Sequence, residues 1–352
     1  MWARYDVSFH RAGSKRLGHP AVGIVTLDFE AMESPSDPDL TLLVYAVQPG
    51  TPAGDALELI GHWADDSWPR NACHDENRWH TRRSTMNARR PVRIAVQLQP
   101  QHAPYEKIRD TAAELEDMGV DVLFNWDHFF PLYGDADGLH FESWTMLAAL
   151  AEQTSRVEIG ALVNCNSYRN AHLQADMART IDHISAKGGA GRFIFGTGSG
   201  WFERDYNEYG YEFGTVGSRL NALGADLPKI EERWGKLNPA PTRKIPVLIG
   251  GGGEKKTLRL VAKHADIWHS FSDAETLERK LGILAEHGEA VGRDVSEIEI
   301  STEIGKREVA EVEEQYALGA TLLSVGITGP DYDLSGLADW LSWRDDKNAA
   351  AV

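Results

Sequence analysis

The feature that most constrains this chain is a strand-then-helix alternation that begins at Val92 and continues towards the C-terminus. Eight short apolar, β-branched runs recur there: VRIAVQL, VDVLF, VEIGALV, RFIFGTG, PVLIGG, DIWHSF, EIEISTE and TLLSVGI. Helical patterns separate them, and several end on glycine, the usual helix C-cap, as at Gly119 and Gly319. Continuous apolar strands joined by helical crossovers indicate parallel pairing with both faces buried. Eight such units in about 255 residues match a closed (β/α)8 TIM barrel, an α/β fold.

An open, doubly wound sheet is the structural alternative to the barrel. Such a sheet requires a GxGxxG turn after its first strand, where this chain reads QLQPQHAPY. We therefore predict a barrel domain over residues 92–347.

Composition limits the classes of partner. Lys and Arg number 36 against 53 Asp and Glu, a formal net charge of -17, which repels nucleic-acid backbones. The two cysteines, Cys73 and Cys165, have neither disulfide-framework nor zinc-ligand spacing, which fits a reducing cytoplasm and predicts no metal site. No apolar run approaches the roughly 20 residues that span a bilayer. The start, MWARYDVSFHRAG, shows no secretory signal. We expect a cytoplasmic protein with a small-molecule substrate, no membrane or nucleic-acid partner, and a homodimer as an open question.

Residues 67–91 are predicted to be a linker. The stretch WPRNACHDENRWHTRRSTMNARRP is polar, rich in Arg and Asn, and has neither strand nor helix periodicity. It separates residues 1–66 from the barrel.

In a (β/α)8 barrel the active site lies at the C-terminal ends of the strands. Asp127 and His128 follow the second strand and are the best acid/base candidates, because histidine titrates near neutrality and a carboxylate can orient it. The alternative is that the pair only caps a loop. Glu203, after the fourth strand, is a second proton-transfer candidate, although Glu203–Asp205 also fits a solvated turn. Nothing near Cys165 marks an activated thiolate.

A glycine run, Gly250–Gly253, follows the fifth strand and opens a helix. Backbone N–H groups at a helix start, with Lys255 and Thr257 as further donors, suit a phosphate. The alternative is a flexible loop that caps the helix.

Several long segments carry a family resemblance: VRIAVQLQPQH, VLFNWDHFFPLYGD, VEIGALVNCNSYRN, ADMARTIDHIS, GTGSGWFERDYNEYGYEFG, PVLIGGGGEKKTL and ADIWH. They resemble the luciferase-like monooxygenase superfamily, in its branch of coenzyme F-420-dependent oxidoreductases, from about residue 92 to 343. The resemblance implies a deazaflavin in the barrel mouth, packed on a bulge in the third strand at Leu162–Val163, often with a non-prolyl cis peptide. It also matches the Asp-His of relatives to Asp127-His128 and their phosphate-side glycine pair to Gly252-Gly253.

The cofactor-binding residues that we expect on this basis share one location, the ends of strands two to five. They are Asn125, Asp127, His128, Leu162, Val163, Asn164, Gly198, Ser199, Gly200, Trp201, Gly251, Gly252, Gly253, Lys255 and Thr257. One departure matters. Trp201 stands where sugar-phosphate-oxidising relatives place a Glu, with Glu203 two residues on, so neither their acid role nor their substrate is transferred.

The N-terminal part resembles something else. WARYDV, KRLGHPAVGIVTLDFEAM and DPDLTLLVYAVQPGTPAGDALELIGHWA look like the C-terminal half of the PAS-like ligand-binding domain of MmyB-like transcription regulators. Those domains follow a helix-turn-helix, which is not visible here. We expect residues 1–66 to be a small, partial α+β segment, a fused or truncated remnant.

Four functions compete. The leading one is hydride transfer between coenzyme F-420 and a small organic substrate, apolar or aromatic because Trp126, Phe129, Phe130, Trp201 and Tyr206 lie near the site. The second is an FMN-dependent luciferase-like monooxygenase. The third is a ligand-sensing regulator acting through residues 1–66, against which the missing DNA-binding helices count. The fourth is a barrel without catalysis. The substrate and the direction of hydride transfer stay open.

Overall fold

The computed structural model describes residues 12–19, 23–34, 37–46, 90–305 and 309–350. The chain divides into two compact units, Met1–Glu76 and Asn77–Val352. All but the last two residues of the expected linker, 67–91, lie outside the described residues.

The described part of the first unit is a three-stranded antiparallel sheet. Its strands are β1 (Ala12–His19), β2 (Gly23–Ser34) and β3 (Asp37–Ala46), in the order β1-β2-β3. Thus β2 is central, and it has an irregularity in its pairing with β3 between Glu33 and Ser34. The helical part of the expected α+β segment lies outside the described residues.

The second unit is a closed parallel barrel, which confirms the predicted fold. Its strands pair in the order β6-β5-β4-β12-β11-β10-β9-β8, and the pairing of β6 with β8 closes the ring. The strands are β4 (Arg93–Leu98), β5 (Val122–Asn125), β6 (Glu158–Ala161), β7 (Asn164–Cys165), β8 (Phe193–Gly198), β9 (Val247–Gly250), β10 (Ile267–Ser270), β11 (Glu299–Glu303) and β12 (Ala320–Ile327).

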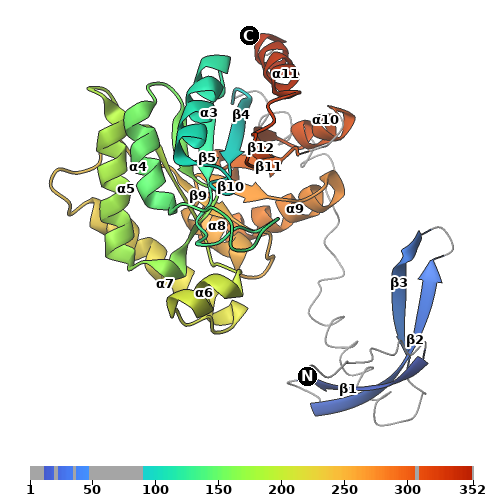
Figure 1. Cartoon of the computed structure of the whole chain (residues 1–352). Coiled ribbons are helices and arrows are strands. Elements are labelled where there is room, and N and C mark those ends of the chain that lie inside the picture. The colour runs from blue at the N-terminus through green and yellow to red at the C-terminus, as the bar shows by residue number, and fades with distance from the viewer. Residues whose placement is uncertain (1–11, 20–22, 35–36, 47–89, 306–308, 351–352) are drawn as a thin grey trace, which may run out of the picture. The chain divides into compact units, whose positions relative to one another are not determined.

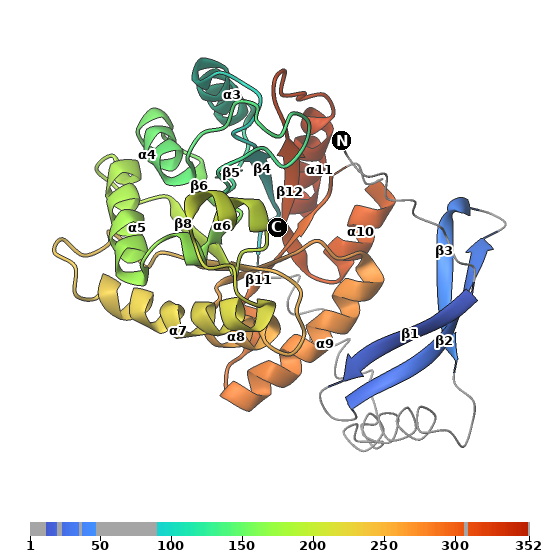
Figure 2. The ribbon, with the colours of Figure 1, turned by 60° about the horizontal axis from the view of Figure 1, so that its bottom comes forward.

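Helices surround the barrel, as Figures 1 and 2 show. They are α3 (Tyr105–Met118), α4 (Ser143–Gln153), α5 (Ala171–Ala186), α7 (Val216–Trp234), α8 (Thr257–His264), α9 (Ala274–Val291), α10 (Val309–Ala317) and α11 (Leu337–Ala350). Gly119 caps α3 in the left-handed conformation, with φ of 98°, as its position predicts. One further helix, α6 (Glu203–Tyr209), was not among the predicted helical patterns, and it crosses in front of the strands in Figure 2.

Successive side chains of a strand point to opposite sides of the sheet. In this barrel apolar side chains on both sides are buried. On β9 and β10, Leu248 and Ile267 join the inner cluster that fills the barrel, whereas Ile249 and Trp268 join the outer cluster beneath the helices. The inner cluster consists of Ala95, Val122, Phe124, Leu162, Ile194, Leu248, Ile267 and Leu322, with Val163 packed against it. This double burial explains why the sequence reads as continuous apolar runs rather than as alternation.

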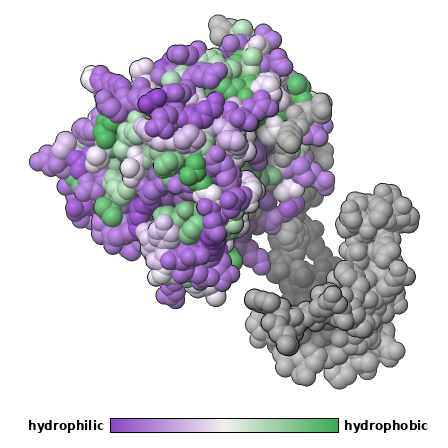
Figure 3. Space-filling view, viewed as in Figure 1, coloured by the Kyte–Doolittle hydropathy of each residue, from purple (hydrophilic) through white to green (hydrophobic). Residues whose placement is uncertain are grey.

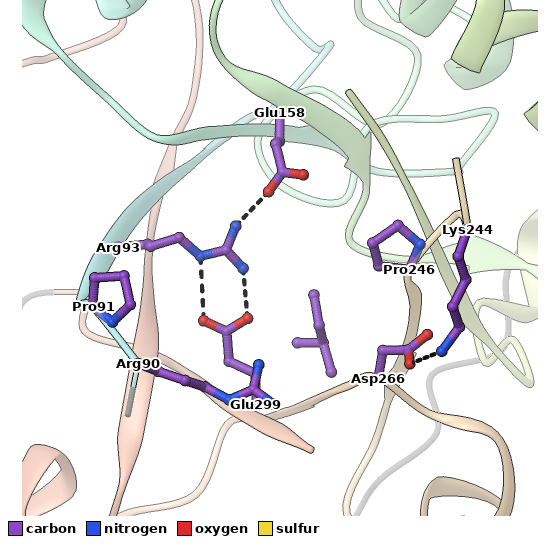
Figure 4. Close-up of a pocket in the computed structure, with 9 residues that line it drawn as sticks. Arg90, Pro91, Arg93, Glu158, Lys244, Pro246, Asp266 and Glu299 are labelled. Carbon is purple, nitrogen blue, oxygen red and sulfur yellow. Dashed lines mark hydrogen bonds and ion pairs between the residues drawn. The ribbon is translucent and has the colours of Figure 1, made fainter. Parts of the chain in front are cut away.

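The base of the barrel, where the strands begin, is tied by ion pairs around a cavity of about 320 Å³. The Arg93 guanidinium lies between Glu158 and Glu299 and bonds to both (Figure 4). Arg243 adds a second bond to Glu158, at 2.7 Å. These charges are already paired with one another at the end of the barrel opposite the predicted site, so we interpret this cavity as part of the structural base.

The third strand is interrupted. After β6 a cis peptide bond joins Leu162 and Val163, and the strand resumes as β7 before a single 3-10 turn, η1 (Asn166–Tyr168). Thus β8 pairs with β6 near its start and with β7 near its end. The cis bond lies where the family resemblance placed it.

The face of the barrel in Figure 3 is mainly hydrophilic, with apolar residues in small separate patches. Among the described residues, no helix has the length and apolar character needed to cross a bilayer.

Candidate active site

The C-terminal ends of the strands carry most of the candidate residues. Large aromatic side chains stand exposed on the loops there: Trp201 after β8 is 64% exposed, Tyr133 after β5 is 62% and Phe271 after β10 is 66%. Exposed rings of this size next to polar groups offer contact area to an apolar ligand.

His128 follows β5 and is mostly covered, with 12% of its side chain exposed. Its Nδ1 lies 2.8 Å from Oδ2 of Asp205 on α6. The rings of Trp126, Trp201 and Phe202 present edges or faces to the imidazole at centroid distances of 5.8, 5.8 and 5.4 Å. The contact with Asp205 fixes the Nδ1 side of the imidazole, and three aromatic rings pack around the ring.

Asp205 has no exposed side-chain surface and accepts three hydrogen bonds. Besides His128, its Oδ1 accepts from the backbone N–H of Phe129 at 3.1 Å, and its Oδ2 accepts from the hydroxyl of Tyr168 at 2.9 Å. Burial, together with the nearby carboxylate of Asp205, raises the pKa of Tyr168, so this phenol stays a donor at neutral pH.

Asp127 does not face His128. Its carboxylate forms a two-pronged ion pair with Arg169, at 2.6 and 3.0 Å, and accepts the backbone N–H of Cys165 at 3.0 Å. Complete burial raises the pKa of Asp127, and the guanidinium opposes that rise. Arg169 also bonds to Glu142. Asp127 therefore ties the end of β5 to β7 and to the loop before α5.

Asn125 and Asn164, both expected near the cofactor, are buried in the wall. The amide of Asn125 donates to the carbonyl of Ser143 at 2.9 Å, and its oxygen accepts from the Ser143 hydroxyl at 3.0 Å. Asn164 donates to Gln174 at 2.8 Å and accepts from the indole of Trp144 at 2.7 Å. Their side chains hold helices α4 and α5 against the strands.

Val163 lies between two strand-end glycines inside the barrel. A Cβ at Gly198 would come within 2.8 Å of one Val163 methyl, and a Cβ at Gly250 within 2.9 Å of the other. The carbonyl of Leu162 accepts from the side-chain amide of Gln97 at 2.6 Å. Without side chains on the two glycines, the wall around Val163 is smooth, which suits contact with a flat ring.

The loop after β8 turns sharply at Gly200, whose φ is +78°. A Cβ there would lie 2.1 Å from the Tyr206 hydroxyl and 2.5 Å from the Cys165 sulfur, so only glycine fits. The carbonyl of Ser199 accepts from Tyr206 at 3.4 Å. Glu203 begins α6 and is exposed, on a surface hollow formed with Arg204, Asn207 and Glu208.

The glycine loop after β9 lies beside a cation that the sequence analysis missed. A Cβ at Gly252 would stand 2.3 Å from Nζ of Lys280 on α9. The same ammonium donates to the Ser272 hydroxyl at 3.3 Å. Gly251 has φ of +119°, Gly253 lies against the Thr257 hydroxyl, and Lys255 is exposed. Backbone amides, a hydroxyl and an ammonium together form a donor set that fits a phosphate.

Other titratable groups near the strand ends are held uncharged. Burial lowers the pKa of His140 to about 4, and its Nε2 accepts from the Trp126 indole at 3.0 Å. Burial raises the pKa of Cys165 to about 11, which opposes a nucleophilic role. Burial also lowers the pKa of His269 to about 4, and its Nδ1 lies 2.8 Å from the Ser301 hydroxyl. Within the described ranges, no group of three or more His, Cys, Asp or Glu side chains could hold a metal ion.

The sequence places Tyr168 and Asp205 after the third and fourth strands but indicates no role for either, and it gives no sign of Lys280. Glu203–Asp205 also fits a solvated turn, because α6 is too short to show a helical period. Lys280 sits within an ordinary amphipathic helix about 28 residues after the glycines. Only the barrel's geometry brings these residues to the strand ends.

Comparison with known proteins agrees with this architecture. Residues 89–222 and 228–316 match the model of the family "Luciferase-like monooxygenase", and residues 1–60 match that of the "MmyB-like transcription regulator ligand binding domain". An uncharacterized protein of Mycobacterium tuberculosis (strain ATCC 25618 / H37Rv) is 25% identical over 168 residues, 44% of this chain and 58% of that protein. Pyrimidine monooxygenase RutA of Klebsiella pneumoniae subsp. pneumoniae is 26% identical over 192 residues, 48% of each chain. The match thus spans about half the length of these curated relatives.

Solved structures share the fold at low sequence identity. An F420-dependent secondary alcohol dehydrogenase in complex with an F420-acetone adduct has a TM-score of 0.64 at 15% identity, covering 74% of this chain and 99% of that one. Riboflavin lyase RcaE, solved with modified FMN and riboflavin, has a TM-score of 0.50 at 11% identity, covering 65% and 66%. Because the family model covers well over half of the 352 residues, and the barrel has the fold of these structures, this chain belongs to the luciferase-like monooxygenase family.

Proposed function

We propose that this chain is a coenzyme F-420-dependent oxidoreductase that transfers a hydride between the deazaflavin and a small organic substrate. The observation that carries the proposal is His128, an imidazole anchored by a buried carboxylate among aromatic rings at the end of a barrel strand. Hydride transfer at a carbonyl or alcohol carbon needs a partner that moves a proton, and an anchored imidazole can do so at Nε2.

The other candidate residues divide into binding and shielding roles. Val163, flanked by Gly198 and Gly250, would support the flat ring. Gly252, Gly253 and Thr257 with Lys280 would hold the phosphate, and the exposed Lys255 follows them in sequence. The amide of Gly251 already donates to the carbonyl of His269 at 3.1 Å. Trp201 and Phe202, whose rings contact His128, would shield the reacting groups from water once the cofactor and substrate cover them. When bound, the deazaflavin supplies a ring carbon that exchanges hydride with the substrate.

The alternative is an FMN-dependent monooxygenase. The family description and the name of the RutA relative support it, and the ring and phosphate contacts above would suit FMN as well. The F420-bound structural neighbour, with a TM-score of 0.64, supports the deazaflavin.

Titration of the purified full chain with F-420 and with FMN, read by quenching of cofactor fluorescence, separates the two. We expect F-420 to bind at least tenfold more tightly. Tighter binding of FMN would replace the proposal with the monooxygenase.

His128→Ala tests the proton-transfer role. We expect kcat to fall by roughly 10²–10⁴-fold while most cofactor affinity remains, because the lost contact acts mainly in the transition state. Glu203→Gln is the comparison and should change kcat little, since Glu203 is exposed on α6. Near wild-type turnover of His128→Ala, with loss of turnover in Glu203→Gln, would move the role to Glu203.

We propose that the N-terminal segment is a fused or truncated remnant of another domain. Residues 1–66 would then contribute to neither cofactor binding nor catalysis, and the barrel, over residues 92–347, would carry the activity. The match of residues 1–60 to the ligand-binding domain model is compatible with a separate origin.

A further inference from the structure

The buried carboxylate of Asp205 is not explained by packing alone. It lies on the short helix α6, 77 residues from His128 in sequence, and its two oxygens receive an imidazole, a phenol hydroxyl and a backbone amide. Bringing a charged group into a fully covered position costs free energy that these hydrogen bonds must offset. A carboxylate that served only to fasten α6 could do so with Tyr168 and Phe129.

We infer that Asp205 is the positioning residue for His128: it fixes the imidazole as the Nδ1–H tautomer, with Nε2 left as the proton acceptor for the substrate. This inference deepens the proposed function and rests on the role of His128 there. Tyr168 and the Phe129 amide in turn fix Asp205, so three elements of the fold converge on the orientation of one ring.

The tautomer of His128 follows from which of the groups around Asp205 carry a hydrogen to donate. An ionised carboxylate has lone pairs and no hydrogen to give, so the His128 nitrogen 2.8 Å away must carry the hydrogen. Tyr168 can serve the same oxygen only as a donor. With Nδ1 occupied, a neutral His128 presents an unprotonated Nε2, the form that accepts a proton from a hydroxyl.

The two rival carboxylates are committed elsewhere. Asp127 is next to His128 in sequence, but both of its oxygens bond to Arg169 and one also to the Cys165 amide. Glu203 points to an exposed hollow on α6. Glu142 bonds to Arg169 and to the first amides of α4. Asp205 is the carboxylate in contact with the imidazole.

Nitrogen-15 NMR of the full chain, labelled at histidine and without cofactor, tests the inference directly. At a pH where His128 is neutral, we expect its Nδ1 to show the shift of a protonated ring nitrogen and Nε2 that of an unprotonated one. The signal is assigned by its loss in His128→Ala. An Nε2–H tautomer in the wild-type protein would overturn the inference without need of any other variant.

Asp205→Asn supplies the kinetic test. An amide offers one acceptor oxygen to three donors, so its NH2 would face the imidazole and favour the Nε2–H tautomer. We expect kcat to fall by about 10²–10⁴-fold, as for a triad histidine held in the wrong tautomer, with KM and the cofactor Kd within about threefold of wild type. An unchanged tautomer and kcat would refute the positioning role.

Tyr168→Phe is the matched control. It removes one donor from Asp205 but leaves the contact with His128, so the tautomer should persist and kcat should fall less than tenfold. Loss of the Nδ1–H tautomer in this variant would mean that the phenol, rather than the carboxylate, sets the ring. The two proposals fail separately: an active His128→Ala removes the catalytic role, whereas a wrong tautomer removes only the positioning by Asp205.

Discussion

Replacing Arg169 by methionine should destabilise the barrel far more than replacing another arginine near the same strand ends. Arg169 is 10% exposed and pairs with Asp127, which is 0% exposed. Methionine keeps much of the side-chain volume but leaves a buried carboxylate without its cation. Breaking one partner of a buried pair costs about 3–5 kcal/mol. The matched control is Arg204→Met: that arginine pairs with Asp137, which is 82% exposed, and such a surface pair contributes about 0–1 kcal/mol.

The free energy of unfolding, from urea titrations followed by tryptophan fluorescence, measures both costs. In Arg169→Met, burial without the guanidinium raises the pKa of Asp127 further above its unfolded value. The folded state then holds the proton more tightly than the unfolded state, so the deficit should shrink as pH falls from 8 towards 5. Adding Asp127→Asn should restore part of the loss by removing the stranded charge. A cost for Arg169→Met within 1 kcal/mol of that for Arg204→Met would refute this reasoning.

Three further predictions concern the glycine loop, the N-terminal segment and a buried histidine. Gly252→Val should displace the Lys280 ammonium, which a Cβ would approach to 2.3 Å, and weaken the phosphate-bearing cofactor by isothermal titration calorimetry far more than its phosphate-free ring fragment; equal losses would dismiss the phosphate site. Starting translation at Met86 should leave folding and cofactor Kd intact, measured by circular dichroism and fluorescence titration; an insoluble product or a loss above about tenfold, 1.4 kcal/mol, would show that the segment is a genuine subdomain. Burial lowers the pKa of His269 from 6.5 to about 4. The unfolded state therefore binds the His269 proton first as pH falls, and the free energy of unfolding should decline by about 3 kcal/mol between pH 6.5 and pH 4. Urea titrations should show a shallower decline for His269→Asn, and equal slopes would contradict the assignment.

The barrel strands could be predicted because a strand that is buried on both faces appears in the sequence as a continuous run of apolar residues. Each apolar run expected from the sequence overlaps one strand of the barrel, and six runs contain their strand completely. The other two strands differ from their runs by one residue: β5 continues to Asn125, and β12 begins at Ala320. The break in the third strand could not be predicted from the apolar pattern, because VEIGALV is as continuous as the neighbouring runs. Only the family resemblance indicated Leu162–Val163.

The contacts of the candidate acid and base were harder to predict. Asp127 and His128 are adjacent in sequence, but in the loop after β5 their side chains turn to different parts of the fold. One therefore meets Arg169 and the other meets Asp205. Sequence adjacency suggested a pair where the backbone separates the two. The residue that does contact His128 lies on a helix of seven residues, too short for a periodicity argument.

The ion-pair network at the base has a consequence for engineering. Arg93, Glu158 and Glu299 come from β4, β6 and β11, so they brace the ring from three separate points along the chain. None of them belongs to the loops at the other end, such as residues 129–142 and 201–215. Positions of those loops that contact neither His128 nor Asp205 can be exchanged or randomised in libraries while the base keeps the register of the strands. The barrel would then be a scaffold for selecting loop variants with new substrate preferences, with the residues of the base unchanged.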